Sequence, residues 1–384
     1  MRGGLSTFNR ELAIQLAKHP DVQVSVFLPK CDKKEKDSAQ KNNVTLVQAT
    51  SRPDYEEIYG LCFPPDDLQI DFVIGHGVIL GRQAQVIRGI RQCKWIQFVL
   101  TEPEELGMYH DYSDAISKGG EEHRGEVDLC ELADLVVAVG PKLAEAYRYY
   151  LLRNEEDQKV LCLTPGIFSE LSKFSQKQQD SSKCQVLAVG RGDAEDFSFK
   201  GFGIAARAIG SLSYVHLIVV GAQTEQRDEL KLRFHEEFGM PPERLSIRNF
   251  TETRERLEQQ FFEVDLAIMP SRIDDFGLVA LEAMSAHVPI LVSADSGFGE
   301  ALSPFPFGSL FAINSEHADD WATAIETFWK KTRKVRLQES NSVRDSYAKE
   351  YSWEEQCTNF VEEMRMMLDG RFVVAMHVIH VCLK

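Results

Sequence analysis

The sequence lacks any apolar run that approaches the roughly 18 residues of a membrane-spanning helix, and its first residues show no signal-peptide pattern. We therefore expect a soluble globular protein without a transmembrane segment. A basic excess is also lacking, because 43 Lys and Arg stand against 59 Asp and Glu, for a formal net charge of -16 at pH 7. Nucleic-acid phosphates need a basic surface, so we expect no nucleic-acid partner. An anionic ligand would need a local basic pocket.

Closely spaced cysteine pairs are absent as well. The eight cysteines are scattered, without a Cys-x-x-Cys pair or a histidine cluster, so the sequence predicts neither a disulfide framework nor a zinc site. Free thiols fit a reducing compartment, and we expect a cytoplasmic location.

The chain has 384 residues, of which 43% are hydrophobic, and this length predicts about two domains. Its most informative stretch is 265–300. An apolar run at 266–269 closes on Pro270, a helical pattern follows from Phe276, and a second apolar run spans 289–292. Strands that helices cover on both faces read as continuous apolar runs, so this stretch predicts a parallel α/β sheet.

Polar chemistry gathers where this stretch turns from loop to helix. Phe276-Gly277-Leu278 would present backbone N–H groups at a helix N-terminus, which stabilises anions such as phosphate. Asp274 and Glu282 stand eight positions apart and could hold opposite ends of one polar ligand. The alternative is that Asp274 caps the helix and Glu282 is an ordinary solvated residue.

Further candidates follow other predicted strands. Gly3 and Gly4 form a loop that opens a helix, although no strand precedes it, and a flexible terminus is the alternative. His76 follows a predicted strand at 71–74, at the carboxyl end where α/β sheets bind ligands. A purely structural histidine is the alternative there. Arg191 and Lys200 follow the strand at 185–190.

A dinucleotide fingerprint competes in this last region. Gly201, Gly203 and Ala206 fit G-x-G-x-x-A, but such a loop should follow its strand immediately, and Gly201 lies well past Gly190. The next strand ends in Gly221, where a ribose-binding acid is expected. We therefore disfavour nicotinamide binding.

The stretch 274–300 contains, in order, an acid, one further residue, Phe-Gly-Leu, Glu-Ala-Met and a glycine-rich turn that ends in Glu300. This order resembles the donor-site signature of family 4 retaining glycosyltransferases. The resemblance implies the GT-B fold, in which two Rossmann-like α/β domains face each other across a cleft. The family signature begins with Glu where this chain has Asp274. In the family a strand leads into the Gly-Gly turn, so we expect the first strand of the N-terminal sheet to be missing. The apolar tail is long enough to supply a substitute strand.

The expected domains follow from this resemblance. Residues 1–168 form the acceptor-side N-terminal domain and 185–351 the nucleotide-sugar donor domain, with a linker at 169–183. A helix at 352–369 crosses back to the first domain, and 370–384 is an apolar tail without an assigned role. Two polar stretches are expected to be solvated, a loop at 30–41 and a charged run at 330–336. The polar stretch at 102–126 is an acceptor-site candidate, and a mobile surface loop is the default alternative.

The resemblance also implies roles for the candidate residues. Arg191 and Lys200, with the Gly3-Gly4 loop, would neutralise the donor diphosphate, and Glu282 would bind the ribose. Asp274 and the 276–278 backbone would contact the sugar and phosphates.

His76 would contact the sugar from the other domain. The implied activity is that of a hexosyltransferase-type enzyme, which moves a sugar from a nucleotide diphosphate sugar to an unidentified acceptor with retention. The sequence contains no Asp-x-Asp, the motif by which metal-dependent glycosyltransferases hold their cation, so we expect no metal and no cofactor beyond the co-substrate. The alternative is a catalytically silent GT-B protein that senses nucleotide sugars or acts as a scaffold.

Overall fold

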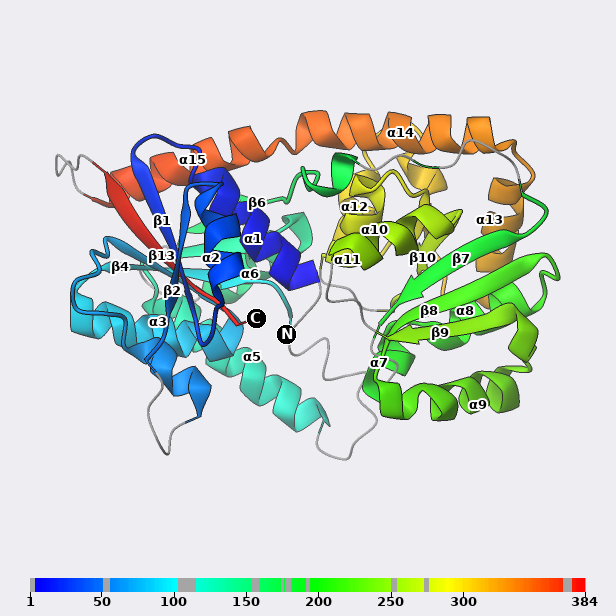
Figure 1. Cartoon of the computed structure of the whole chain (residues 1–384), viewed down its shortest axis with the longest axis horizontal. Coiled ribbons are helices and arrows are strands. Elements are labelled where there is room, and N and C mark those ends of the chain that lie inside the picture. Colours follow the sequence, from blue (N-terminus) through cyan, green and yellow to red (C-terminus); the bar gives the residue numbers. More distant parts are fainter. Residues whose placement is uncertain are drawn as a thin grey trace. The chain divides into compact units, whose positions relative to one another are not determined.

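The computed structural model describes residues 4–50, 56–102, 115–152, 159–173, 176, 181–190, 194–249, 254–272, 276–368 and 375–383. These residues fold as two compact α/β units, each built on one sheet whose strand pairings are all parallel. Figure 1 shows the two sheets with their helices. The α/β class predicted from the apolar runs is confirmed.

The first unit contains a seven-stranded sheet in the order β2-β1-β13-β3-β4-β5-β6. Its strands are β1 (Val22–Leu28), β2 (Val44–Gln48), β3 (Phe72–His76), β4 (Lys94–Val99), β5 (Leu135–Val139), β6 (Val160–Leu163) and β13 (Met376–Val381). Its helices are α1 (Gly4–Leu16), α2 (Lys33–Gln40), α3 (Gly77–Arg91), α5 (Ala115–Leu132), α6 (Pro141–Leu151) and α15 (Trp353–Met367), with a 3₁₀ turn η1 (Glu57–Cys62). Strands β3 and β5 are buried along their whole length, as both-face coverage requires.

Strand β13 comes from the apolar tail and lies inside this sheet. It pairs with β1, with Val24 opposite Val378, and with β3, with Ile74 opposite His380. In Figure 1 the red β13 lies beside the blue β1. The tail therefore supplies a strand to the sheet in which the sequence predicted one to be missing. Its backbone groups pair with those of β1 and β3.

The second unit contains a six-stranded sheet in the order β12-β11-β10-β7-β8-β9. Its strands are β7 (Cys184–Val189), β8 (Val215–Ala222), β9 (Leu245–Asn249), β10 (Leu266–Met269), β11 (Ile290–Ser293) and β12 (Ala312–Ile313). Its helices are α7 (Ala194–Phe199), α8 (Phe202–Gly210), α9 (Arg227–Phe238), α10 (Arg254–Glu263), α11 (Leu278–Ser285), α12 (Gly297–Leu302), α13 (Ala318–Trp329) and α14 (Arg333–Glu350). The 3₁₀ turns are η2 (Leu171–Lys173), η3 (Thr224–Gln226), η4 (Pro242–Arg244) and η5 (Gly308–Leu310). A continuous apolar core of these strands and helices includes Trp321 and Phe234.

The chain passes from the first unit to the second after Pro165 and returns at Tyr351, so α15 is grouped with the first unit. Phe168, just before the predicted linker, and Leu171 within it are both buried in the second unit. The Phe168 N–H donates to Ser285 Oγ of α11 at 3.0 Å.

Parts of two stretches predicted as loops are helical in the described residues, which corrects that prediction. Residues 33–40 form α2 because Asp32 and Glu35 make a reciprocal capping box that satisfies the first backbone N–H groups. The polar stretch before Glu126 enters α5, whose last turns bury Leu129 and Cys130. Both stretches are polar, and so they were predicted as loops. A cap is enough to stabilise α2, and a short apolar face is enough to stabilise α5.

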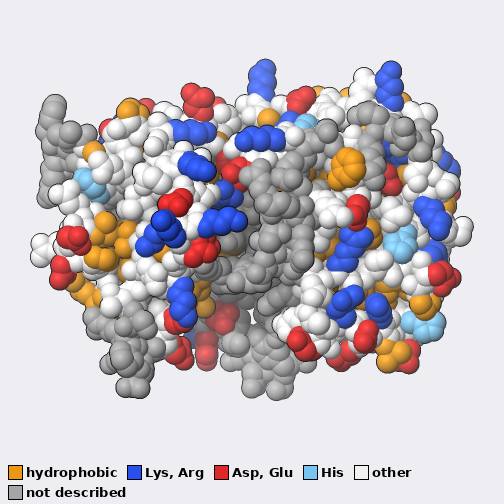
Figure 2. All heavy atoms as spheres, viewed as in Figure 1, with side chains coloured by type: hydrophobic (Ala, Val, Ile, Leu, Met, Phe, Trp, Pro, Cys, Tyr) orange, Lys and Arg blue, Asp and Glu red, His pale blue; other side chains and the backbone are white. Residues whose placement is uncertain are grey.

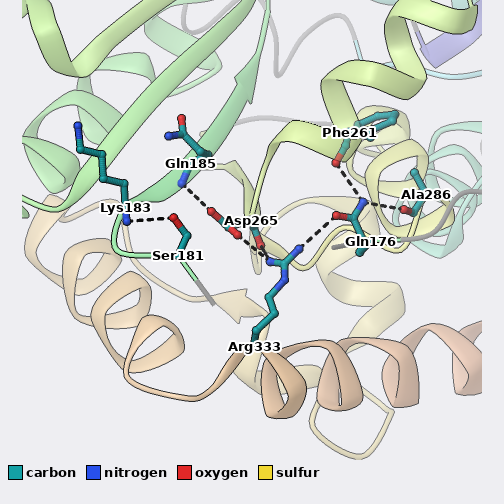
Figure 3. A network of polar contacts seen from close by, with 8 residues as sticks. All are labelled: Gln176, Ser181, Lys183, Gln185, Phe261, Asp265, Ala286 and Arg333. Atoms are coloured by element: carbon teal, nitrogen blue, oxygen red, sulfur yellow. Dashed lines mark hydrogen bonds and ion pairs between the residues drawn. The ribbon is translucent and has the colours of Figure 1, made fainter. Parts of the chain in front are cut away.

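The charged run 330–336 is also not simply solvated. Arg333 is 1% exposed; its Nη1 forms an ion pair with Asp265 Oδ1 at 3.0 Å, and its Nη2 donates to Gln176 Oε1 at 3.2 Å. Asp265 Oδ2 in turn accepts from the Gln185 N–H at 2.9 Å, and Gln176 reaches the carbonyl oxygens of Phe261 and Ala286 (Figure 3). This network ties the starts of β7 and β10 to α14.

Arg336 is likewise 1% exposed, and its guanidinium lies 4.0 Å from the ring centroid of Trp329. The methylene chain of arginine and the flat face of its guanidinium both pack well on apolar surface. The charge pattern of the sequence did not predict this packing.

Candidate functional site

The donor-motif residues of the second unit lie on three neighbouring strands. Strands β7, β10 and β11 are adjacent in the sheet, and the motif loops follow the carboxyl ends of all three. Parallel α/β sheets bind their ligands at that edge. The sheet order thus brings together Lys200, the 276–278 turn and the glycine-rich turn at 296–300, which are far apart in the sequence.

The loop that carries Lys200 is held by the loop after β10. The Arg272 N–H donates to the Phe199 carbonyl oxygen at 2.8 Å, and a Cβ on Gly201 would lie 1.9 Å from the Pro270 carbonyl oxygen. Gly201 has a φ of 69°, which favours glycine. Lys200 Cγ lies 3.4 Å from the Cβ position of Gly190, so the lysine stem passes the end of β7. These contacts hold the stem of Lys200 at the carboxyl end of β7.

The turn into α11 is fixed by an aromatic anchor and a glycine. Phe276 is buried, and its ring centroid lies 5.9 Å from that of Phe298, which in turn packs on Tyr347. Gly277 is the N-cap residue, with a φ of 84°. Leu278 is the first residue of the helix, so its N–H is among those that have no acceptor within the helix. The predicted anion site would use these N–H groups, and that role stays a prediction.

Glu282 lies on the second turn of α11 and is 7% exposed. The alternative of an ordinary solvated glutamate is therefore wrong. Ionised carboxylates are rarely buried unless they have a function or partners.

The third loop, after β11, is also tightly built. Ser296 caps α12: its Oγ accepts from the Gly299 N–H at 3.0 Å and donates to the Ser293 carbonyl oxygen at 2.7 Å. A Cβ on Gly299 would lie 2.2 Å from that same carbonyl oxygen. A side chain at position 299 would therefore force this loop apart.

Four predicted site residues receive no side-chain description. Gly3, Arg191 and Asp274 lie outside the described residues, and Gly4 is described only as the first residue of α1. Their roles stay predictions.

His76 is the last residue of β3 and is 4% exposed. Its Nε2 makes a short contact with Nε2 of His380 on β13, and its Nδ1 is buried without a hydrogen-bond partner. Burial, together with the neighbouring His380, holds the pKa of His76 well below its usual value, so the ring is neutral. His380 and Cys382 were not among the residues predicted from the sequence. Their two-residue spacing on an apolar strand was the available signal.

The dinucleotide alternative fails on local structure. Helix α7 lies between β7 and Gly201, so the G-x-G-x-x-A residues open α8 and not the turn that follows the strand.

Figure 2 shows acidic and basic side chains interspersed over the face that it draws. All eight cysteines are free, and no helix in the described ranges is long and apolar enough to cross a membrane.

Comparison with protein families gives a match over residues 1–360 to the model described as Family 4 Glycosyltransferase in conflict systems. The chain belongs to this family. The family 4 resemblance drawn from the residues 274–300 is thereby confirmed.

The family 4 chain is similar to D-inositol 3-phosphate glycosyltransferase of Mycobacterium marinum, with 25% identity over 248 residues, which cover 60% of this chain and 49% of that protein. The chain spans at most about half of the length of the curated relatives it matches. Its fold is similar to sucrose-phosphate synthase from Thermosynechococcus elongatus, with a TM-score of 0.76, 18% identity, and coverage of 96% and 94% of the two chains. Anabaena HepE in complex with UDP and glucose gives a TM-score of 0.69, 15% identity, and coverage of 95% and 97%. These likenesses support the GT-B fold.

Proposed function

We propose that this family 4 protein transfers a hexosyl group from a nucleotide diphosphate sugar to an acceptor, with retention at the anomeric carbon and without a metal at the diphosphate. The observation that carries the proposal is the meeting of three donor-motif loops at the carboxyl edge of β7, β10 and β11. Each loop is held by close backbone packing, and such preorganisation is what charge stabilisation in a transition state requires.

The leaving diphosphate needs positive charge, which a chain with a net charge of -16 must place locally. Lys200 supplies one cation and the α11 N-terminus supplies partial positive charge beside it. Arg191 and the Gly3-Gly4 loop complete the phosphate contacts in this proposal. These groups take the part that a metal ion plays elsewhere, and no cofactor beyond the co-substrate is needed.

Glu282 is assigned to the donor ribose, because it is the acid that α11 holds one turn beyond the phosphate-binding end. Asp274 and the backbone of 276–278 are assigned to the sugar and phosphates.

His76 is assigned to the sugar through Nδ1, since its Nε2 is occupied by His380.

The proposal includes a cytoplasmic location, because all eight cysteines are free thiols.

The relatives suggest which donor to try first. The HepE structures contain UDP, UDP with glucose, or UDP-glucose, and a related trehalose-phosphate synthase is described as UDP-forming. We therefore assign uridine diphosphate as the nucleotide and glucose as the first sugar to test.

The test combines binding with turnover. Calorimetric titration with UDP measures affinity, and release of UDP from UDP-glucose without acceptor measures slow hydrolysis, both in the presence of EDTA. A glycosyltransferase binds UDP and hydrolyses its donor, whereas a silent sensor binds and releases no product. Absence of UDP binding would contradict the uridine assignment, and absence of binding to every nucleoside diphosphate of a panel would contradict both functions.

A further inference from the structure

Three side chains of the metal-ligating kind meet inside the first unit. The ligand atoms of His76, His380 and Cys382 all lie within 4.8 Å of one another. All three residues are buried, with exposures of 4%, 0% and 4%. Within the part of the chain that the structure describes, no other three His, Cys, Asp or Glu residues are grouped in this way.

The strand pairing creates this cluster. His380 of β13 lies opposite Ile74 of β3, and side chains two residues apart share one face of a strand. His76 and Cys382 each follow two residues further along their strands, so all three point to the same side of the sheet. Phe98 of β4 packs against the His76 ring on this side, with centroids 5.2 Å apart, and Phe8 of α1 and Phe360 of α15 cover Phe98.

The arrangement of the ring nitrogens suits coordination. An imidazole nitrogen that carries no proton has a lone pair that can bind a metal. The two Nε2 atoms face each other at less than an ordinary hydrogen-bond separation, and both Nδ1 atoms are buried without partners. The ring nitrogens of His76 and His380 therefore have one polar contact, the one between their Nε2 atoms, and no other hydrogen-bond partner in the described residues.

Asn9 of α1 adds a fourth polar group. It is 7% exposed, and its side chain hydrogen-bonds Cys382. Its Oδ1 is buried without a hydrogen-bond partner. An amide that donates to the sulfur and keeps a free oxygen is a supporting group for a metal-bound thiolate.

We propose that His76 Nε2, His380 Nε2 and Cys382 Sγ bind one Zn²⁺ ion in the first unit, with Asn9 beside it. Two imidazoles and a thiolate suit zinc, whereas Mg²⁺ and Ca²⁺ prefer oxygen ligands. Zinc bonds of about 2.0–2.1 Å to nitrogen and 2.3 Å to sulfur place tetrahedral ligand atoms about 3.3–3.6 Å apart, which lies inside the observed 4.8 Å limit.

Binding the ion requires the two Nε2 atoms to separate by a side-chain rotation. It also replaces the Cys382 S–H proton, which passes to the buffer.

The ion would join β13 to β3 and so connect residues 304 positions apart in the chain. Metal on Nε2 fixes the His76 proton on Nδ1, the atom that the proposed transfer reaction assigns to the sugar. The zinc site does not depend on that assignment, because its test measures metal and not activity.

The experiment titrates Co²⁺ into chelator-treated full-length protein. We expect tetrahedral d–d bands and thiolate-to-Co²⁺ charge-transfer absorption that saturate at one equivalent and are bleached by Zn²⁺. Zn²⁺ should raise the melting temperature by about 5 °C or more, while Mg²⁺ should not. Wild-type protein without thiolate absorption at one equivalent would overturn the proposal whatever the variants do.

Variants then assign the ligands. Cys382→Ser should abolish the charge-transfer absorption, and Cys382→Ser and His380→Gln should each lower Zn²⁺ affinity more than about a hundredfold. Losing only a supporting hydrogen bond, as in Asn9→Ala, costs about 10- to 100-fold. Cys93→Ser is the matched control, since Cys93 is a buried thiol of the same unit at 7% exposure. Charge-transfer absorption that persists in folded Cys382→Ser, or disappears in Cys93→Ser, would also overturn the proposal.

Discussion

The carbonyl oxygen of Pro270 occupies the space next to Gly201 where any side chain would begin, because a Cβ on Gly201 would lie 1.9 Å from that oxygen. This contact sets the distance between the Lys200 loop after α7 and the loop after β10. Gly201 is therefore required for two reasons at once, its φ of 69° and the absence of a Cβ.

Gly201→Ala should destabilise the second unit by about 2–4 kcal/mol, since a left-handed backbone position and a forced loop shift both add cost. UDP affinity should fall with it, because the loop that carries Lys200 moves. Denaturant unfolding and calorimetry check the two effects. Gly210→Ala in α8 is the control: no atom lies within 4 Å of its Cβ position, and neither quantity should fall. Equal stability of the two variants would contradict the packing argument.

Lys200→Ala should weaken UDP binding by roughly ten- to a hundredfold, the loss expected for one charge-assisted hydrogen bond of about 1.5–3 kcal/mol. Folding should survive, because Lys200 lies on a loop and its removal leaves no core cavity. Lys183→Ala is the matched control, since Lys183 is an exposed lysine just before the other end of β7. Equal UDP affinity of wild type and Lys200→Ala would mean that the phosphates bind elsewhere.

Glu282→Gln should lower UDP affinity while it leaves inorganic pyrophosphate affinity nearly unchanged, because the ribose is the assigned partner. The shape of the side chain is kept, so the buried position at 7% exposure is not emptied. Parallel calorimetric titrations with UDP and pyrophosphate make the comparison. A parallel loss of both affinities would assign Glu282 to the phosphates or to the fold.

Arg333→Met should destabilise the second unit by about 3–5 kcal/mol, because it leaves the Asp265 carboxylate without its buried ion-pair partner. The control is Lys330→Met, which removes an exposed pair with Glu326 whose side chains are 70% and 47% accessible. Surface pairs of this kind contribute under about 1 kcal/mol. Denaturant midpoints measure both variants, and a Lys330 effect as large as that of Arg333 would refute the importance of burial.

Deletion of residues 371–384 should sharply lower the melting temperature and the solubility of the protein. The deletion removes β13 and exposes the facing edges of β1 and β3, whose unpaired backbone groups invite aggregation. A synthetic peptide of residues 371–384 should restore part of the melting temperature when added to the shortened chain. Unchanged solubility and melting temperature after the deletion would show that the sheet does not need β13.

Local sequence patterns predicted much of the fold. The helix predicted to follow the Gly3-Gly4 loop is α1, which begins at Gly4. The apolar run at 266–269 is β10, and the run at 289–292 matches β11 to within one residue at each end. Periodicity, caps and glycine turns act between residues a few positions apart, so a single sequence carries them. The glycine-rich turns and Glu282 were recognisable for the same reason.

Tertiary structure alone decided the rest. Nothing local marks Arg333 as the partner of Asp265, because the two residues are 68 positions apart and a charge run usually means solvated surface. The meeting of His76 with His380 spans 304 positions and depends on β13 lying between β1 and β3. The sequence by itself determined most of the strands and helices and the donor-motif loops, since these follow from neighbouring residues. The strand order, which only the folded sheet specifies, determined which of their side chains meet.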